Sequence, residues 1–363
     1  MATMELSLGL DVKAVLDDVA ETLVISGTGD MYNYNDTSNL SPLNSYYFST
    51  IEIQNGVTSI GDYCFYGVIF NTISIPSSVT RVGDGAFKES HVYTDVVFPN
   101  SVSYIGANCF YDTDVVNVTL PTGIIRLEDG CFRSCNNIAN IVIPNSVTHM
   151  GDDCFNDCYG LETIKLPSNL QYIGDRCFYR CSKLTSIDLP ESVTYIGNEV
   201  FWGNWLLPSV VIPSNTKYIG VNCFYDCRAI KTVTIIKGVP KNLDRRAFAG
   251  CYGLTTLLIE DGVTHLGDEC FAECHSMTSI TLPSSVTTIG ANCFCGTLAS
   301  ITNKASKPQT IGERAFSPYT SNIQIYGVST NTTFKEAVSN PVVFNWNELQ
   351  LKLVKYDVYR LEY

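Results

Sequence analysis

The chain has 363 residues and is 45% hydrophobic, which is typical of a folded protein with two domains or one elongated domain. Its formal net charge of −13 argues against nucleic acid as a partner, because phosphates attract clustered Lys and Arg. No run of about eighteen or more apolar residues occurs, so we expect no membrane insertion.

Residues 1–50 precede the first repeat of the chain and are expected to form an N-terminal capping segment. The first thirty residues lack a basic start followed by an uninterrupted apolar stretch, so they do not predict a signal peptide. On this ground we expect either a processed or recombinant form of the protein, or a protein that is made in a cytoplasm. Whether it stays there or reaches a surface is left open by this segment.

Residues 51–325 contain a repeat that returns every 22 to 24 residues and is aligned on a phenylalanine. Self-similarity at this period is typical of a solenoid, in which each unit buries its apolar face only against its neighbours. The twelve copies are Phe65, Phe87, Phe110, Phe132, Phe155, Phe178, Phe201, Phe224, Phe248, Phe271, Phe294 and Phe316.

Each repeat contains a short alternating segment such as "TIKLP" at residues 163–167, which predicts a strand with one buried face that ends at proline. A turn with the sequence "SVT-IG" follows the strand, and a segment of the form "CF--C" comes next and is expected to be a short helix. The predicted fold is an α/β repeat of about twelve units. Its parallel sheet would curve along the concave face, with the helical segments on the convex face.

The repeat resembles the BspA-like surface-antigen class of leucine-rich repeat proteins. The resemblance is carried by "GVTSIGDYCFYG" at residues 56–67, "SVTYIGNEVF" at 192–201 and "SVTTIGANCF" at 285–294. Residues 22–34 are similar to the segment that precedes the first repeat in that family. This similarity implies a capping hairpin whose other strand holds "VKAVL", and the family implies a non-enzymatic, adhesion-associated surface protein.

All fifteen cysteines lie in the repeats, eight directly before the phenylalanine and six three residues after it. Alanine or valine fills the first of these positions in the other copies, which indicates that cysteine acts there as a small hydrophobic residue. A zinc site needs four converging ligands, and a disulfide ladder needs close Cα approach at many steps. We therefore favour buried, reduced thiols over either alternative, a state that suits a reducing compartment.

No combination of residues in the sequence indicates catalysis or a cofactor. The GxSxG, HExxH, P-loop and GxGxxG motifs do not occur, and no cysteine is marked as a nucleophile by a positioned histidine. His149 and His265 share a repeat position with several tyrosines, so we interpret them as surface variants. The sequence predicts that the protein is not an enzyme and that it holds no metal.

A stripe of large side chains directly before the "IG" turn is the strongest indication of a ligand-binding surface. Tyrosine and arginine dominate binding hot spots, and this position is otherwise small and polar in the repeat. The stripe comprises Tyr104, Arg126, His149, Tyr172, Tyr195 and Tyr218.

The outward strand residues form two further rows, one of small polar residues and one of mixed character that includes Lys165 and Asp188. These rows suit a glycan or a peptide, or they only keep an exposed sheet soluble. Trp202 and Trp205, in the atypical segment "VFWGNWLLPS", are further candidates for ligand contact, with local repacking as the alternative.

Residues 326–363 leave the repeat and are predicted to be a C-terminal cap or tail. Leu349, Leu351 and Leu353 alternate with polar residues, which predicts a strand that covers the end of the sheet or pairs with another chain. Two functions follow from the sequence. The first is adhesion through a protein or glycan ligand; the second is structural assembly, as a virion-associated or cytoskeletal subunit, through residues 1–20 and 345–363.

Overall fold

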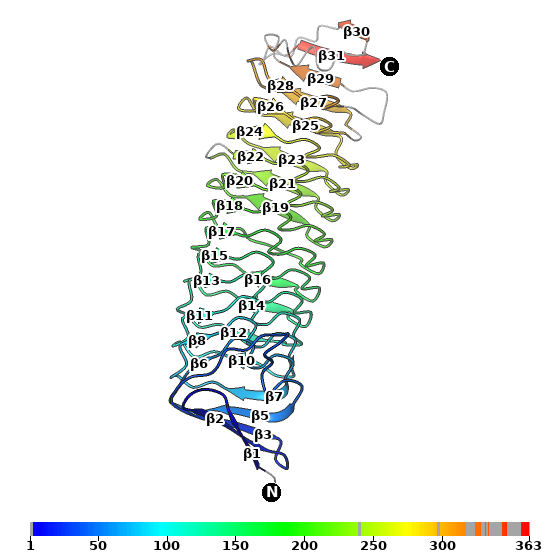
Figure 1. Ribbon diagram of the computed structural model, residues 1–363. Coiled ribbons are helices and arrows are strands. Elements are labelled where there is room, and N and C mark those ends of the chain that lie inside the picture. Colours follow the sequence, from blue (N-terminus) through cyan, green and yellow to red (C-terminus); the bar gives the residue numbers. More distant parts are fainter. Residues whose placement is uncertain are drawn as a thin grey trace. The chain divides into compact units, whose positions relative to one another are not determined.

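The structure is a computed structural model that describes residues 3–238, 241–295, 298–316, 324–327, 331, 333, 343–346 and 357–362. The chain folds as a parallel β-solenoid of about 11 turns with a leucine-rich-repeat fold, as expected from the repeat (Figure 1). It divides into two compact units, Met1–Leu184 (unit 1) and Thr185–Tyr363 (unit 2).

Unit 1 begins with an antiparallel meander that continues into a parallel sheet. β2 pairs antiparallel with both β1 and β3, and β3 then pairs in parallel with β5, followed by β7 and β9. These strands are β1 (Thr3–Ser7), β2 (Val12–Asp17), β3 (Thr22–Gly27), β5 (Tyr47–Ile53), β7 (Ile69–Ser74) and β9 (His91–Val92).

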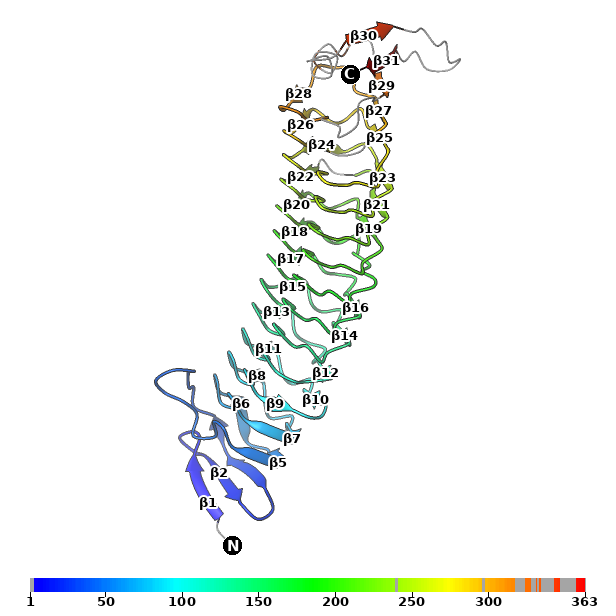
Figure 2. The same cartoon turned by 90° about the vertical axis from the view of Figure 1, so that its right-hand side faces the viewer.

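The rest of unit 1 contains two series of short parallel strands on different sides of the coil (Figure 2). In most turns the residues before the "G" turn, predicted as part of a turn, form the first series. Its strands are β4 (Gly29–Asp30), β6 (Val57–Ile60), β8 (Arg81–Val82), β11 (Tyr104–Ile105), β13 (Arg126–Leu127), β15 (His149–Met150) and β17 (Tyr172–Ile173). The strands that precede proline form the second series: β10 (Val96–Val97), β12 (Val118–Thr119), β14 (Asn140–Val142) and β16 (Thr163–Lys165).

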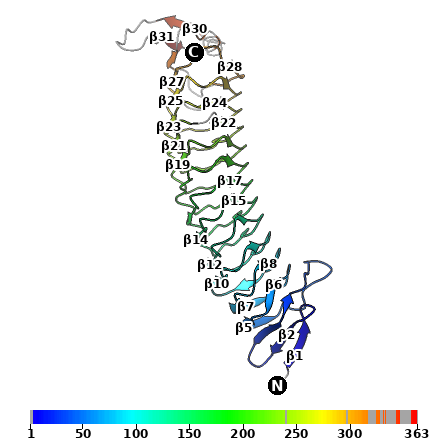
Figure 3. The same cartoon turned by 90° about the vertical axis from the view of Figure 1, so that its left-hand side faces the viewer.

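Unit 2 repeats both series (Figure 3). Its first series is β18 (Tyr195–Ile196), β20 (Tyr218–Ile219), β22 (Lys241–Leu243), β24 (Val263–Leu266), β26 (Thr288–Ile289) and β28 (Thr310–Ile311). Its second series is β19 (Ser209–Ile212), β21 (Thr232–Ile235), β23 (Thr256–Ile259), β25 (Ser279–Leu282), β27 (Ser300–Asn303) and β29 (Gln324–Gly327). β31 (Asp357–Glu362) pairs antiparallel with β29 and with β30 (Val343–Trp346). The tail leucines lie outside the described residues.

The prediction of short helices at the "CF--C" segments is wrong. Through the described residues up to 316 these segments are turns. In the repeats from Phe65 to Phe271, the residues two before and two after the phenylalanine both adopt positive φ. In one repeat these are Asp153 at 55° and Asp157 at 58°, two residues before and two after Phe155. Residues in this left-handed region cannot continue an α-helix. Their backbone N–H groups instead donate to the next turn, as Asp153 N does to Asp175 O at 2.8 Å.

The repeat phenylalanines form the centre of the core in both units. Their rings stack face to face, with centroids 5.2–5.6 Å apart in unit 1 and 4.9–5.8 Å apart in unit 2. Phe155 and Phe248, one from each unit, are completely buried. The phenylalanine therefore fills the interior, as the sequence predicts.

Fourteen of the fifteen cysteines are buried, which confirms their predicted place in the core, and all fifteen are free thiols in the structure. The cysteine three residues after the phenylalanine has a further contact. Its Sγ–H donates to the carbonyl oxygen of the phenylalanine one turn earlier, as from Cys158 to Phe132 at 3.0 Å and from Cys251 to Phe224 at 3.3 Å. These thiols satisfy backbone groups as well as filling space.

Candidate functional site

The predicted stripe lies on the first series of strands, where its side chains point outward and the following residue points into the core. In unit 1 the stripe is divided into two parts. Tyr104 pairs in register with Arg81, whose guanidinium carbon lies 4.2 Å from the centre of the tyrosine ring. No pairing joins β11 to β13 among the described residues, so Tyr104 is not in register with Arg126.

The second part of the stripe in unit 1 is a continuous row of Arg126, His149 and Tyr172. These residues are direct register partners on β13, β15 and β17. The His149 and Tyr172 rings stack at 5.7 Å, and Thr148 Oγ1 lies 2.8 Å from His149 Nδ1. Arg126 is exposed, and its Nε lies 3.5 Å from Glu128. The row offers a cation, an imidazole and a phenol to a ligand.

In unit 2 the stripe is represented by Tyr195 and Tyr218, which are register partners whose rings stack at 5.1 Å. The Tyr218 hydroxyl lies 3.1 Å from Asp244 and 3.4 Å from Asn198. Asn242 and His265 continue the row. The structure therefore brings the predicted tyrosines of this unit together with polar partners on neighbouring turns.

A row of carboxylates runs beside the stripe in unit 1, at the repeat position that follows the turn glycine. It comprises Asp62, Asp84, Asp129, Asp152 and Asp175 and is interrupted by Ala107. The first four of these carboxylates accept a hydrogen bond from the backbone N–H of the equivalent residue one turn later. Asp152 N donates to Asp129 Oδ1 at 2.9 Å, and Asp175 N donates to Asp152 Oδ1 at 2.8 Å. A Cβ atom at Gly151 would overlap Asp129 Oδ1, which explains the glycine.

The carboxylate row gives this side of unit 1 a negative potential. Burial, together with the neighbouring carboxylates of Asp129, Asp175 and Asp153, raises the pKa of Asp152 despite its hydrogen bond from Asp175. Burial and the neighbouring Asp84 likewise raise the pKa of Tyr104. The side chains of the stripe therefore lie beside fixed negative charge.

The second series of strands presents the two predicted rows of outward residues. Side-chain hydrogen bonds join neighbouring residues of the polar row of unit 1 in pairs: Thr72 donates to Thr50 at 3.1 Å, Asn117 donates to Asp95 at 2.8 Å, and Thr163 donates to Asn140. In the second row Lys165 is the register partner of Val142, and both are exposed. Asp188 is exposed in unit 2.

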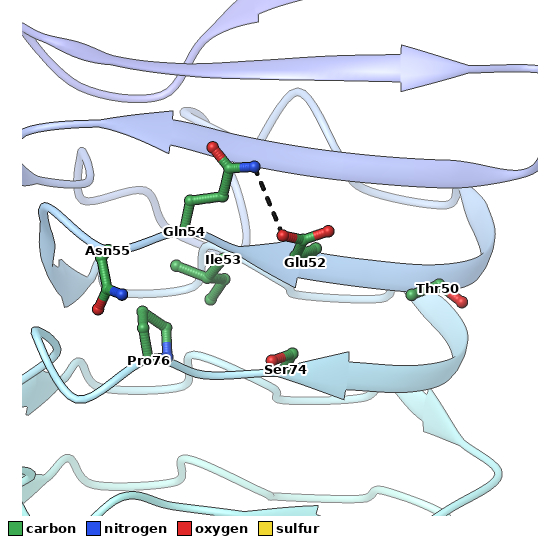
Figure 4. A pocket seen from close by; sticks show the side chains of 7 residues that line it. All are labelled: Thr50, Glu52, Ile53, Gln54, Asn55, Ser74 and Pro76. Carbon is green, nitrogen blue, oxygen red and sulfur yellow. Dashed lines mark hydrogen bonds between the residues drawn. The ribbon is translucent and has the colours of Figure 1, made fainter.

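A shallow pocket of about 540 Å³ lies at the start of this strand face in unit 1 (Figure 4). Glu52 and Thr50 come from β5, while Ser74 lies opposite Glu52 on β7. Gln54 donates to Glu52 at 3.4 Å. The sequence prediction did not include Glu52 and Gln54 because β5 precedes the first repeat phenylalanine. The alternation of "TIEIQ" was the available signal.

The two candidate tryptophans lie on a turn of unit 2. Trp205 is 43% exposed, and its Nε1 donates to Asp226 Oδ2 at 3.1 Å. Trp202 is half-buried, with its ring 4.5 Å from that of Tyr225. Both tryptophans thus contact the next turn, and Trp205 also remains open to a partner.

The described part of the chain contains no group of three or more His, Cys, Asp or Glu residues that could hold a metal ion. Burial raises the pKa of Cys135 to about 12, so this thiol stays neutral near neutral pH. The same physical cause raises the pKa of Cys158 and Cys251. Where the chain is described, it also contains no helix long and apolar enough to cross a membrane.

Turns of 22 to 24 residues that stack in parallel register around rows of aliphatic and phenylalanine side chains define a leucine-rich-repeat solenoid. The chain belongs to the BspA-type leucine-rich repeat family, as the sequence resemblance indicated. The family model, described as the BspA type leucine rich repeat region, matches residues 41–139, 125–254 and 241–340.

One solved structure agrees with this fold, and two others match it at lower TM-scores. A leucine-rich repeat protein from Bacteroides ovatus is 24% identical with a TM-score of 0.62, and the match covers 83% of this chain and 89% of that one. A leucine rich cell surface protein from Faecalibacterium prausnitzii is 22% identical with a TM-score of 0.41, covering 84% and 95%. The pneumococcal vaccine antigen PcpA is 15% identical with a TM-score of 0.49, covering 83% and 87%. None of the curated proteins searched matches the chain.

Proposed function

We propose that the protein is a non-enzymatic recognition module that binds a protein or glycan on a host or other cell surface. The observation that supports this proposal most strongly is the row Arg126, His149 and Tyr172. Parallel register places these three different large side chains side by side, above core positions that are apolar at every turn. Two of the solved structures with this fold are described as a cell surface protein and a vaccine antigen, which supports a surface role.

The strand face of unit 1 supports the same function. Its polar row presents hydroxyl, amide and carboxylate groups that are already held by hydrogen bonds from turn to turn, such as Asn117 to Asp95. Groups held in this way lose little conformational entropy when they bind a hydroxyl-rich sugar or a peptide backbone. The pocket at Glu52 and Ser74 adds a concave end to this face.

The test measures binding of the labelled full chain to epithelial cells that are untreated, treated with trypsin or treated with a mixture of glycosidases. Loss of binding after trypsin indicates a protein ligand, and loss only after glycosidases indicates a glycan. The triple variant Tyr172→Ser, Tyr195→Ser and Tyr218→Ser should bind at least about tenfold more weakly, as expected for removal of hot-spot side chains.

The matched control for this test is Tyr93→Ser, which removes an aromatic side chain that is 64% exposed and lies outside the stripe. We expect it to bind as the wild type does. Circular dichroism on heating checks that each variant is folded. Equal binding by the triple variant and the control would contradict a role for the stripe, and absence of binding by the wild type would contradict the proposed function.

A structural role in an assembly is the second candidate function. It is favoured by β1, which is the outermost strand of its sheet and pairs only with β2 among the described residues. An unpaired strand edge can accept a strand from another chain. Deletion of residues 1–20 should then abolish incorporation into larger particles, measured by sedimentation, without weakening cell binding.

A further inference from the structure

Unit 1 contains a second shallow pocket, of about 460 Å³, where the segment between β4 and β5 lies against the first repeat turns. We call it the loop pocket. Its volume is in the range of pockets that hold small molecules or single side chains of a partner. Its lining includes Asp36, Leu40 and Asn44 from the segment, and Tyr66, Ile69 and Glu89 from the repeat turns.

The segment between β4 and β5 is fixed to the repeat turns by three contacts. Asn44 Nδ2 donates to the carbonyl oxygen of Tyr66 at 2.9 Å, and the buried Ser41 hydroxyl donates to a carbonyl oxygen of the same turn at 2.6 Å. Lys88 Nζ donates to Asp36 Oδ2 at 2.6 Å. The loop pocket is therefore formed before a ligand arrives, and binding costs little conformational entropy of the protein.

Glu89 offers one carboxylate oxygen to a ligand in this pocket. Its Oε2 accepts a hydrogen bond from the Tyr66 hydroxyl at 3.0 Å, and its side chain is 41% exposed. Its Oε1 lies 3.7 Å from Lys88 Nζ, which is too long for a hydrogen bond. Glu89 Oε1 can therefore accept a hydrogen bond from a donor that enters the loop pocket.

Apolar side chains lie beside the carboxylates of the loop pocket. Leu40 is 45% exposed, and Ile69 on β7 is half-buried. A ligand that fits both kinds of group has an aliphatic stem and a cationic end, as a lysine side chain does. A guanidinium fits less well, because it pairs best with both oxygens of a carboxylate and Tyr66 already donates to one oxygen of Glu89.

Lys88 shows that this region of unit 1 accepts an ammonium group. Its side chain is 16% exposed, and its Nζ lies 5.4 to 5.8 Å from the ring centres of Tyr63, Tyr66 and Tyr111. Burial lowers the pKa of Lys88, but its hydrogen bond with Asp36 and the nearby carboxylate charges outweigh burial and raise it. The open part of the loop pocket lies against the same carboxylates.

The charge around the loop pocket also favours a cationic ligand. Unit 1 contains 21 Asp and Glu residues against 9 Lys and Arg, a formal net charge of −12. At the pocket itself, the carboxylates of Asp36 and Glu89 face the single cation of Lys88. The lining residue His91 brings a third carboxylate close, because its Nδ1 lies 2.5 Å from Asp114. A basic partner is therefore attracted from a distance as well as on contact.

We propose that the loop pocket of unit 1 binds a lysine side chain of a partner protein. The stem of that lysine lies against Leu40 and Ile69, and its ammonium group donates to Glu89 Oε1. The loop pocket shares no residue with the stripe, so this site does not depend on the stripe. It adds to the protein a preference for a basic partner.

The test titrates the full chain with Nα-acetyl-lysine amide from about 0.1 to 30 mM, followed by saturation-transfer NMR. We expect saturable binding in the millimolar range, with the strongest transfer at the side-chain methylene protons. Nα-acetyl-norleucine amide has the same stem without the ammonium group and should bind about three- to fivefold more weakly, the usual worth of an exposed ion pair.

Two variants locate the binding site. Glu89→Gln keeps the shape of the side chain and removes its charge, so it should weaken binding about three- to fivefold. Leu40→Ala should weaken it about two- to fivefold, because part of the apolar contact with the stem is lost. Glu52→Gln is the matched control: it removes the same charge from the other pocket of unit 1 and should leave binding unchanged. Thermal melting verifies that each variant is folded.

Absence of saturable binding would overturn the proposal. So would equal binding of the norleucine derivative, or a Glu89→Gln variant that behaves as Glu52→Gln does. Displacement of the lysine derivative by glucose at similar concentrations would assign the loop pocket to a sugar instead. No cell-surface ligand enters these measurements, so their failure is distinguishable from failure of the proposed recognition function.

Discussion

Units 1 and 2 have interiors of the same kind but differ in the charge of their surfaces. Both stack phenylalanine rings about one turn apart, and both donate cysteine thiols to the phenylalanine carbonyls of the preceding turn. Residues 1–184 nevertheless contain 21 Asp and Glu against 9 Lys and Arg, a net charge of −12, while residues 185–363 contain 15 against 14, a net charge of −1. The units are thus built alike and charged differently.

This contrast shows how a solenoid separates folding from recognition. An inward row must repeat, because each side chain packs against the same position one turn away. An outward row contacts only its neighbours and solvent, so it is free to change in charge and size. Unit 1 uses this freedom for a carboxylate row beside the stripe. Unit 2 uses it for a row of exposed planar side chains that contact one another from turn to turn: Trp205, Arg228, Tyr252 and His275.

The largest expected effect tests whether the two interiors are equivalent. Phe155→Ala in unit 1 and Phe248→Ala in unit 2 each remove a completely buried ring and should each lower the free energy of unfolding by about 3–5 kcal/mol. Urea denaturation followed by circular dichroism measures the change. A loss in one unit that is less than half the loss in the other would show that the interiors are not equivalent.

The next largest expected effect concerns the stability contributed by a cation that lies near aromatic rings in each unit. Lys88 in unit 1 has a side chain 16% exposed, and its Nζ lies 2.6 Å from Asp36. Lys88→Met should cost about 1.5–3 kcal/mol, as for a lost hydrogen bond between charged groups. Arg228→Met in unit 2 should cost less than Lys88→Met, because the Arg228 side chain is 58% exposed and solvent screens its ion pair. Urea denaturation compares the free energies of unfolding of the two variants. Equal decreases would contradict the expectation that the more buried cation contributes more.

A smaller effect distinguishes the two cysteine positions. Cys158→Ala removes the Sγ–H donor to Phe132 and should lower the free energy of unfolding by about 1–2 kcal/mol. Cys131→Ala changes a position that alanine already fills in other turns, such as Ala86, and should cost less than about 1 kcal/mol. Thermal melting with reductant ranks the two variants, and the opposite ranking would refute the role of the S–H bond.

The smallest effect tests the charge difference itself. Burial raises the pKa of Asp152, so the folded state disfavours the ionised carboxylate, and this penalty is present above the folded-state pKa. Asp152→Asn should therefore stabilise unit 1 at pH 7 by about 0.2–1 kcal/mol, discounted for solvent screening. In unit 2, Asn198 already fills this role, accepting from Val221 N at 2.9 Å.

The gain from Asp152→Asn should disappear near pH 3, where the carboxyl is protonated in both the folded and the unfolded state. It should also shrink in about 1 M salt, which screens the neighbouring carboxylates. Differential scanning calorimetry at both pH values measures these changes. A gain that persists at low pH would show that the repulsion is not its cause.

Much of the architecture was predictable from residue spacing. The period of the phenylalanines predicted a solenoid, and the alternation around Ile164 predicted the strand that became β16. The helical segments were predicted wrongly because a cysteine, a phenylalanine and a cysteine at helical spacing also fit a turn. Gly85 and Gly130, two residues before their phenylalanines, were the overlooked signal, since both adopt positive φ.

For the candidate site, the sequence indicated which positions belong to the same outward row. It did not indicate where strand pairing along a row is interrupted. Tyr104 and Arg126 are equivalent in the repeat, yet β11 and β13 belong to different sheets. Lys241 illustrates the same limit inside the core. The strand register shifts between Lys241 and Asn242, and the Lys241 side chain is buried. Its Nζ donates to the carbonyl oxygens of Pro213 and Ser214 at 3.2 and 3.1 Å. Such shifts depend on contacts between turns.

The sequence by itself determined the repeating turn, the inward rows and the membership of the family, because a 22- to 24-residue period must bury the same positions at every turn. Only the tertiary structure decided that the "CF--C" segments are turns and that Trp205, Arg228, Tyr252 and His275 meet. Those outcomes depend on backbone torsions and on contacts between residues more than twenty positions apart, which local periodicity does not encode.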